Sequence, residues 1–360
     1  PYKSVPFLAG LYKDISKLDD NYWKAIKLKE VSDLIQNCLG LRLQFNTFQE
    51  TGVVKTSLPT QLLILNPSPI AIKLEKINGA INLEISKKIV QNQPWESRQN
   101  YQIPNKISTP YWLLKNGDLG NYYVQNESLK GLAETPNPIK VNFNVIINNT
   151  YIPIQVPLKY KTTDRVAGEV LQNFQILPQA TIQLKDKVIL FQKDKVKKVS
   201  LQVKAHIQNF KGFVTLKVPK NWDFFPKKQD VKIDRAGAVK EFIFNVTPPK
   251  GSDTGIFSGL VSDGIQDYNM TLEEIEYPHI SKQYMLSPNK TIVSKIDLKS
   301  KVSKVAYLKG AGDKVAESLR NIGITVAEFE IDELRLENLL NYPALIIGIR
   351  AFNVHKELAF

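Results

Sequence analysis

The first residues to weigh are those that could hold a catalytic metal. In hydrolases, zinc is bound by histidine, aspartate or cysteine, and it activates a water molecule and polarises a carbonyl group. The chain has three histidines, His206, His279 and His355, and one cysteine, Cys38. The histidines lie far apart and none belongs to a His-Pro-Asp or His-x-x-His pattern. We therefore expect no catalytic residue, no metal ligand and no cofactor within this chain.

A glycine-rich turn offers a second kind of chemistry. Gly310 and Gly312 follow an apolar, strand-like stretch and precede a helical pattern, so their backbone N–H groups could face an anion. A dinucleotide fingerprint would need a third glycine where Val315 stands, and the Gly-Lys-Ser/Thr ending of a phosphate-binding loop is absent. The competing interpretation is a tight turn with Asp313 near the start of a helix, where a negative charge is favourable.

Two clusters of aromatic residues could bind carbohydrate, because flat rings can cover the apolar face of a sugar. One cluster lies in TPYWLLKNGDLGNYYV (109–124) and the other in KNWDFFPKK (220–228). The alternative is that these side chains close the ends of hydrophobic cores, as large aromatic residues commonly do. The candidates for glycan contact are Tyr111, Trp112, Tyr122, Tyr123 and Trp222.

The elements that must position these residues are mostly short strands. Apolar residues at three- and four-residue steps predict a helix over 21–39, with a cap among Asp19, Asp20 and Asn21 and a C-terminal glycine at Gly40. Alternating strands then follow, the clearest being a hairpin in VNFNVIINNTYIPIQVPLKY (141–160). A second strand series, from ATIQL to GIFSGLVS, has the spacing of an immunoglobulin-like sandwich.

The last segment, 304–360, alternates strand and helix patterns and so predicts a parallel sheet. It stops before such a sheet could cover both of its faces, and we expect it to be an incomplete domain. The predicted fold class is thus mainly β: an N-terminal helix, two immunoglobulin-like sandwiches and the start of a flavodoxin- or amidotransferase-like α/β domain. The expected divisions are a helical linker 1–40, a first sandwich 41–162, a connector 163–178, a second sandwich 179–278, a connector 279–303 and an incomplete α/β domain 304–360.

Composition limits the partners. The formal net charge is +13, but the lysines are scattered along strands, where they discourage edge-to-edge pairing. No helix-turn-helix, zinc-finger or ribonucleoprotein pattern accompanies them, so we expect no nucleic-acid partner. No apolar run approaches the ~20 residues of a membrane-spanning helix, and the first residues lack the pattern of a signal peptide.

Six segments spread along the chain form a recognisable series. They are LKEVSDLIQNCLGLRLQ (28–44), TPYWLLKNGDLGNYYV (109–124), DRVAGEVLQNFQILP (164–178), YPHI (277–280), YLKGAGDKVAESLRNIG (307–323) and ALIIGIRAFN (344–353). Together they resemble the middle and C-terminal regions of large Bacteroidetes-type PIG-L deacetylases. The similarity extends from about Trp23 to Asn353, nearly the whole chain.

The resemblance implies a parent enzyme that removes acetyl groups from an N-acetylated sugar with a bound zinc. The family's His-Pro-Asp-Asp-type motif has no counterpart here, so the zinc and the chemistry are expected in an N-terminal catalytic domain outside this chain. This chain would be a non-catalytic accessory region that positions glycan or the catalytic domain. Its compartment would be the periplasm, the outer membrane or the exterior. The alternative is a structural or adhesive envelope protein of sandwich modules without enzymatic activity.

Overall fold

β-Strands dominate the structure, a computed structural model that describes residues 1–115, 117–192, 194–277, 279–296 and 299–359. Asn116 of the aromatic segment and Pro278 of the YPHI tetrad lie outside the described residues. The chain forms two compact units. The first contains Pro1–Gln179 and Glu273–Leu286, and the second contains Ala180–Leu272 and Ser287–Phe360.

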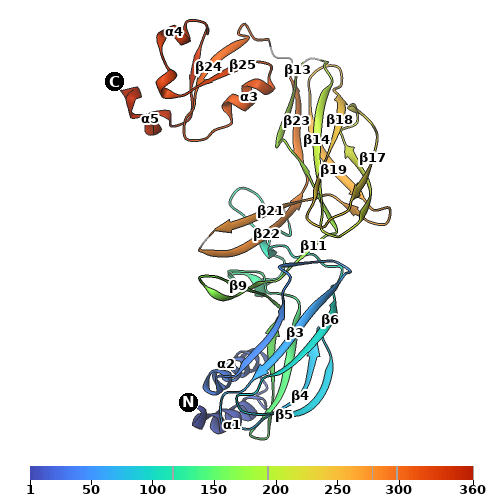
Figure 1. Cartoon of the computed structure of the whole chain (residues 1–360), viewed down its shortest axis with the longest axis vertical. Helices are drawn as coiled ribbons and strands as arrows, with labels where there is room; N and C mark the ends of the chain where they lie inside the picture. The colour runs from blue at the N-terminus through green and yellow to red at the C-terminus, as the bar shows by residue number, and fades with distance from the viewer. Residues whose placement is uncertain (116, 193, 278, 297–298, 360) are drawn as a thin grey trace. The chain divides into compact units, whose positions relative to one another are not determined.

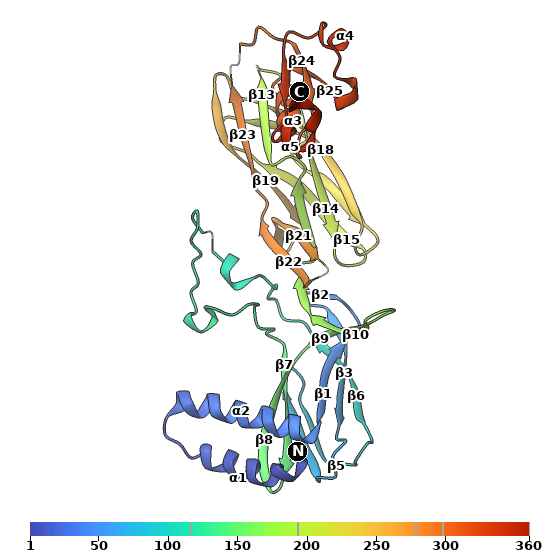
Figure 2. The same ribbon diagram turned by 90° about the vertical axis from the view of Figure 1, so that its left-hand side faces the viewer.

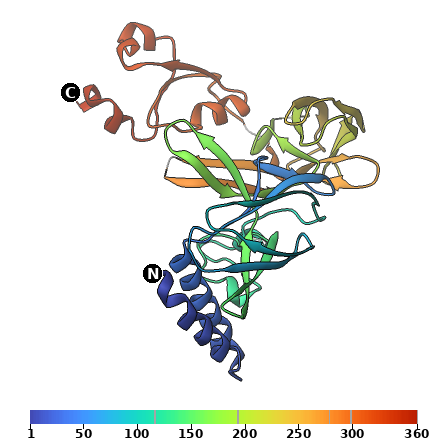
Figure 3. The ribbon, with the colours of Figure 1, turned by 60° about the horizontal axis from the view of Figure 1, so that its bottom comes forward.

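Two helices begin the first unit, and they lie side by side (Figures 2 and 3). They are α1 (Val5–Ile15) and α2 (Asn21–Leu39). The Asp20 carboxylate accepts hydrogen bonds from the N–H groups of Tyr22 and Trp23, each at 3.0 Å, and Gly40 ends α2 in the left-handed conformation with φ +63°. These two caps satisfy N–H and C=O groups that a helix leaves free at its ends. The predicted helix 21–39, with its caps, is therefore confirmed.

The strands of the first unit form two larger sheets with a small parallel pair (Figure 1). The five-stranded sheet runs β10 (Gly168–Asn173), β9 (Lys159–Asp164), β1 (Arg42–Thr47), β3 (Ser57–Leu65) and β6 (Trp95–Gln102). The four-stranded sheet runs β5 (Leu83–Ile89), β4 (Ile72–Gly79), β7 (Lys140–Ile147) and β8 (Thr150–Pro157). The parallel pair is β2 (Thr51–Val53) with β11 (Gln175–Leu177).

The two sheets bury one face each, and β1 contacts β7 and β8 of the other sheet. Phe45 and Leu62 are fully buried on the five-stranded sheet, as are Phe143 and Val145 on the four-stranded sheet. The predicted hairpin is confirmed: β7 and β8 pair antiparallel around a turn in which Asn148 and Asn149 both have positive φ. Such two-residue turns match the twist of the strands that they join.

The second unit contains two further sheets around one hydrophobic core. One sheet runs β12 (Ala180–Leu184), β14 (Lys197–Ala205), β18 (Val239–Thr247) and β16 (Asp223–Phe225). The other runs β13 (Val188–Gln192), β23 (Thr291–Ile296), β19 (Asp253–Ser262), β15 (Phe210–Lys217) and β17 (Gln229–Ile233), with β20 (Asp267–Tyr268) paired to β19.

The C-terminal part of this unit is a three-stranded parallel sheet in the order β25-β24-β26. Its elements are β24 (Lys304–Leu308), α3 (Val315–Asn321), β25 (Thr325–Phe329), α4 (Leu336–Leu339), β26 (Leu345–Ile347) and α5 (Ala351–Val354). A small core lies between this sheet and α3, with Tyr307 and Ala316 among its buried residues.

Strands also occupy parts of the two stretches expected as connectors. β10 and β11 lie within 163–178, and β22 (Ile280–Pro288) and β23 lie within 279–303. β22 pairs with β21 (Met270–Tyr277), and β23 pairs with β13 and β19. The stretches expected as connectors therefore contain strands, some paired with a neighbour in sequence, such as β10 with β9, and some with a distant segment, such as β11 with β2. None of the helices in the described chain combines the length and the apolar character needed to cross a bilayer.

Candidate carbohydrate-binding site

A long segment between β6 and β7 forms a hollow in the first unit. Its described residues contain two short 3-10 helices, at Tyr111–Leu113 and Glu127–Leu129, and an isolated bridge between Asp118 and Asn121. It is held to strand β11, because the Ser108 N–H donates to the Ile176 carbonyl at 2.9 Å and the Ile176 N–H donates to the Ser108 hydroxyl at 2.9 Å. Long segments of this kind in compact domains are often binding loops.

The hollow has a volume of about 230 Å³, and its wall is mainly apolar. This is somewhat below the ~300–1,000 Å³ of pockets for drug-sized ligands, so the hollow suits a ligand no larger than one sugar ring. Among its lining residues are Pro110, Tyr111, Leu114, Leu129, Phe174 and Tyr284.

Tyr111 is buried and fixed at both ends. Its N–H donates to the Thr135 hydroxyl at 2.9 Å, and its own hydroxyl donates to the Leu132 carbonyl at 2.9 Å. The ring also meets that of Trp112 edge to face, with centroids 4.9 Å apart. Such contacts hold the apolar wall in one arrangement before any ligand binds, which reduces the entropy lost on binding.

Polar groups line one side of the hollow. The Asn173 side-chain amide donates from Nδ2 to the Glu134 carboxylate, and its Oδ1 accepts from the Lys159 ammonium at 2.5 Å. Glu134 and Asn173 both line the hollow. An apolar wall with a few fixed polar groups is the usual composition of a small-molecule site.

Tyr284 reaches the hollow from β22 and is held by a charged cluster. Its hydroxyl donates to the Glu50 carboxylate at 2.6 Å, while Lys282 lies 3.0 Å from Glu50 and 3.1 Å from Glu274. Burial raises the pKa of Tyr284, and the hydrogen bond to Glu50 raises it further. Partial burial acts to lower the pKa of Lys282, but the hydrogen bonds to Tyr284 and to the two carboxylates outweigh it, so this pKa is raised. Tyr284 is therefore a neutral donor and Lys282 a cation at ordinary pH.

The other aromatic candidates of this segment do not line the hollow. Trp112 is half-buried beside Tyr111, whereas Tyr122 and Tyr123 are exposed further along the segment. The Tyr123 hydroxyl donates to the Asp118 carboxylate at 2.6 Å. Of the four predicted residues here, Tyr111 alone is a wall of the hollow and Trp112 supports it.

Trp222 lies in the core of the second unit with 5% of its surface exposed. Its ring meets Phe191 and Phe257 edge to face at 4.8 and 5.2 Å, and its indole N–H donates to the Asp253 carboxylate at 2.7 Å. A ring enclosed in this way has no free face for a sugar. This burial favours the alternative of an aromatic residue in a core, and the glycan contact of Trp222 stays a prediction.

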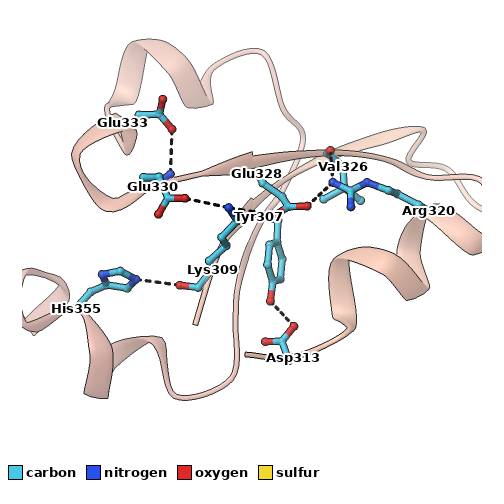
Figure 4. A network of polar contacts seen from close by, with 9 residues as sticks. All are labelled: Tyr307, Lys309, Asp313, Arg320, Val326, Glu328, Glu330, Glu333 and His355. Atoms are coloured by element: carbon cyan, nitrogen blue, oxygen red, sulfur yellow. Dashed lines mark hydrogen bonds and ion pairs between the residues drawn. The ribbon is translucent and has the colours of Figure 1, made fainter. Parts of the chain in front are cut away.

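The side chain of Asp313 folds back onto the glycine turn, and Figure 4 shows its contact with Tyr307. The Asp313 carboxylate accepts from the Tyr307 hydroxyl, from the Val315 N–H at 3.0 Å and from the Ile349 N–H at 2.8 Å. These bonds lower the pKa of Asp313, the one from Tyr307 most. Burial and the same contact raise the pKa of Tyr307 to about 12. The Asp313 carboxylate thus takes two backbone N–H groups near this turn, those of Val315 and Ile349.

Gly310 is required in this turn for close packing. A Cβ at this position would lie 2.2 Å from the Ile349 carbonyl oxygen, while Gly312 has φ +86° and open space around it. The close packing of Gly310 and the bonds of Asp313 favour the interpretation as a tight turn, and the anion-binding role of Gly310 and Gly312 stays a prediction.

The charged side chains around the parallel sheet pair with one another (Figure 4). Lys309 lies 2.9 Å from Glu330, and Arg320 lies 2.5 Å from Glu328. His355 contacts the Lys309 carbonyl oxygen at 3.0 Å. Within the part of the chain that the structure describes, no group of three or more histidine, cysteine, aspartate or glutamate residues is arranged to hold a metal ion.

Sequence reasoning missed several residues of the hollow. Phe174 and Tyr284 belong to strand regions more than 60 and 170 residues from Tyr111, and only the folded structure brings them to the same hollow. Glu134 lies in the same long segment as Tyr111, but no periodicity marks it. The density of proline, glycine and asparagine in that segment was the one signal available.

Comparisons with known proteins give no family. No protein-family model matches the chain, and no curated protein matches it. A protein of unknown function from Porphyromonas gingivalis W83 is 8% identical with a TM-score of 0.20, over 71% of this chain and 98% of that one. Native Escherichia coli α2-macroglobulin is 10% identical with a TM-score of 0.25, over 71% of this chain and 17% of that one. Similarities this weak carry no argument about fold or function.

Proposed function

We propose that this chain is a non-catalytic accessory region that holds a glycan for a zinc-dependent N-acetyl-sugar deacetylase of the PIG-L type. The observation that carries the proposal is the hollow beside Tyr111, with its fixed apolar wall and its polar side at Glu134 and Asn173. The sequence motifs that resemble the PIG-L family supply the connection to deacetylation. The zinc and its ligands would belong to a catalytic domain outside this chain.

The same proposal includes the finer fold assignments. The two packed sheets of each unit would be sandwiches, the second of them immunoglobulin-like. The order β25-β24-β26 corresponds to 2-1-3 in chain order, which is the order in which flavodoxin-like sheets begin. Such domains would hold a glycan chain near the catalytic domain, in the periplasm, at the outer membrane or outside the cell.

A calorimetric titration with a β-linked N-acetylglucosamine tetrasaccharide tests the glycan site. Leu114 lines the hollow and is 64% exposed, so Leu114→Ala should leave the fold intact. Losing its contact with a sugar should cost about 1 kcal/mol, or roughly fivefold in affinity.

Leu119 is the matched control, since it lies in the same segment and is fully exposed away from the hollow. Leu119→Ala should bind as the wild type does. Absence of binding to the wild-type chain at millimolar sugar, or equal affinity of the two variants, would refute the site. A purely structural or adhesive role would then be the better account.

A further inference from the structure

A second hollow lies on the outer face of the five-stranded sheet in the first unit. Its volume is about 450 Å³, and it is formed by β3, β6 and the turn after β1. We call it the Arg98 hollow and define it by Phe48, Pro59, Thr60, Gln61, Arg98, Gln99 and Asn100.

Successive side chains of a strand point to opposite faces of the sheet, and those that form the Arg98 hollow point away from the core. Leu58, Leu62 and Ile64 of β3 are fully buried, so the odd-numbered residues of β3 face outward. The register pairs Gln61 with Arg98 and Pro59 with Asn100. These side chains therefore lie together on the outer face of the sheet.

Arg98 brings a positive charge that the hollow does not balance. No carboxylate belongs to the hollow, and across the described residues we find no ion pair to the Arg98 guanidinium. Elsewhere on this sheet Lys161 is paired with Glu169, 2.6 Å away. The Glu96 carboxylate, two residues before Arg98 on β6, accepts a hydrogen bond from the Gln61 amide at 3.0 Å. A guanidinium has five donors in a fixed plane, which matches a carboxylate with two parallel hydrogen bonds.

Phe48 supplies a flat apolar surface beside that charge. It follows β1 directly and is 65% exposed, although an aromatic side chain gains stability from burial. The amides of Gln61 and Asn100 add hydrogen-bonding groups on the same face. One ring, one cation and two amides are the groups that would recognise a pyranose ring with a carboxylate.

We propose that the Arg98 hollow binds a hexuronic acid residue of an acidic glycan. The carboxylate would pair with Arg98, the apolar face of the sugar would cover Phe48, and hydroxyl groups would meet Asn100. This inference rests on the proposed function for the carbohydrate nature of the ligand, but it concerns a different site from the hollow beside Tyr111. A peptide fits less well, because an added strand would pair with the edge of β6 and leave the face of the sheet free.

The test is a titration of the full chain with tri-galacturonic acid and with neutral galactotriose, at low and at physiological salt. The wild type should bind the acidic trisaccharide and bind the neutral one at least tenfold more weakly. Arg98→Gln should lose at least tenfold for the acidic sugar, since it removes the charge. Arg98→Lys should lose several-fold, since it keeps the charge without the planar fork.

Arg42 is the matched control. It is exposed and lies on the same outer face of the sheet, on strand β1. Asn46 of β1 pairs with Gln61, which pairs with Arg98. Arg42 is four residues from Asn46, so it lies about 13 Å from this line of paired residues, measured along the strand. Arg42→Gln removes the same charge and should change the affinity less than twofold. Equal losses for the two variants would mean unspecific attraction to a basic protein and would overturn the proposal, as would equal binding of the two sugars.

The two sites are distinguishable in the same experiment. Leu114→Ala should weaken binding of the N-acetylated tetrasaccharide and leave the acidic trisaccharide unaffected. If the wild-type chain binds the acidic trisaccharide but not the N-acetylated tetrasaccharide, the proposed function is overturned and the uronic acid site stands. If the wild-type chain binds the tetrasaccharide but not the acidic trisaccharide, the uronic acid site is overturned and the proposed function stands.

Discussion

Replacing Trp222 by alanine should destabilise the second unit by about 3–5 kcal/mol, the range for a large aromatic residue in a packed core. The side chain is almost fully enclosed, meets two phenylalanine rings and donates a hydrogen bond to Asp253. Trp222→Phe keeps an aromatic ring in the core and loses that bond. It should cost less, about 1–1.5 kcal/mol, because the Asp253 carboxylate is half-exposed and can bind water instead.

Amide hydrogen exchange measured by mass spectrometry isolates this effect from the first unit. Peptides from β14 lie in the same core, so their slowest amides should exchange roughly one hundred- to a few thousand-fold faster in Trp222→Ala, at about 1.4 kcal/mol for each tenfold change. Exchange in β3 of the first unit is the internal control. Unchanged exchange in β14 together with weaker glycan binding would refute the core role and return Trp222 to the list of sugar contacts.

Three further substitutions test the loops and clusters described above. Asp313→Asn should lower the melting temperature at neutral pH, because the pKa of Asp313 is lowered in the folded state. The difference from the wild type should persist above pH ~4 and vanish as the pH falls through that lowered pKa. Gly310→Ala should cost about 1–3 kcal/mol and speed amide exchange in β26, since its Cβ would meet the Ile349 carbonyl; unchanged exchange would contradict the packing. Glu50→Gln should cost about 1 kcal/mol in denaturant unfolding and lower the pKa of Tyr284 in a spectroscopic titration, and an unaltered titration would rule out their hydrogen bond.

Local signals in the sequence were sufficient for some elements. Helix α2 could be predicted to the residue because its start and its end are encoded within one turn of it, by Asp20 and Gly40. The hairpin at Asn148-Asn149 was equally clear, since asparagine tolerates positive φ and the flanking strands alternate with period two. In both cases the interactions that decide the structure join residues close in sequence.

The remaining features depend on contacts between distant segments. β1 pairs in parallel with β9, more than 100 residues later, and β23 completes a sheet whose other strands begin at Val188. Contacts with distant segments also decide which of the predicted aromatic residues lies beside a hollow and which lies in a core. Tyr111 and Trp222 have similar local surroundings in sequence, but the strands around Trp222 enclose it, whereas the segment that contains Tyr111 leaves a hollow beside it. Arg98 became notable only when the register placed it beside Gln61 in a hollow that no carboxylate lines.

The central claim is that the hollow beside Tyr111 binds a sugar, and a chemical-shift titration of the ¹⁵N-labelled chain with the N-acetylated tetrasaccharide tests it most directly. The account predicts saturable shifts for the backbone amides of Ser108, Tyr111 and Ile176, which frame the hollow, and none for those of β14 in the second unit. Shifts that never saturate, or that appear around β14 and leave Tyr111 unmoved, would contradict it.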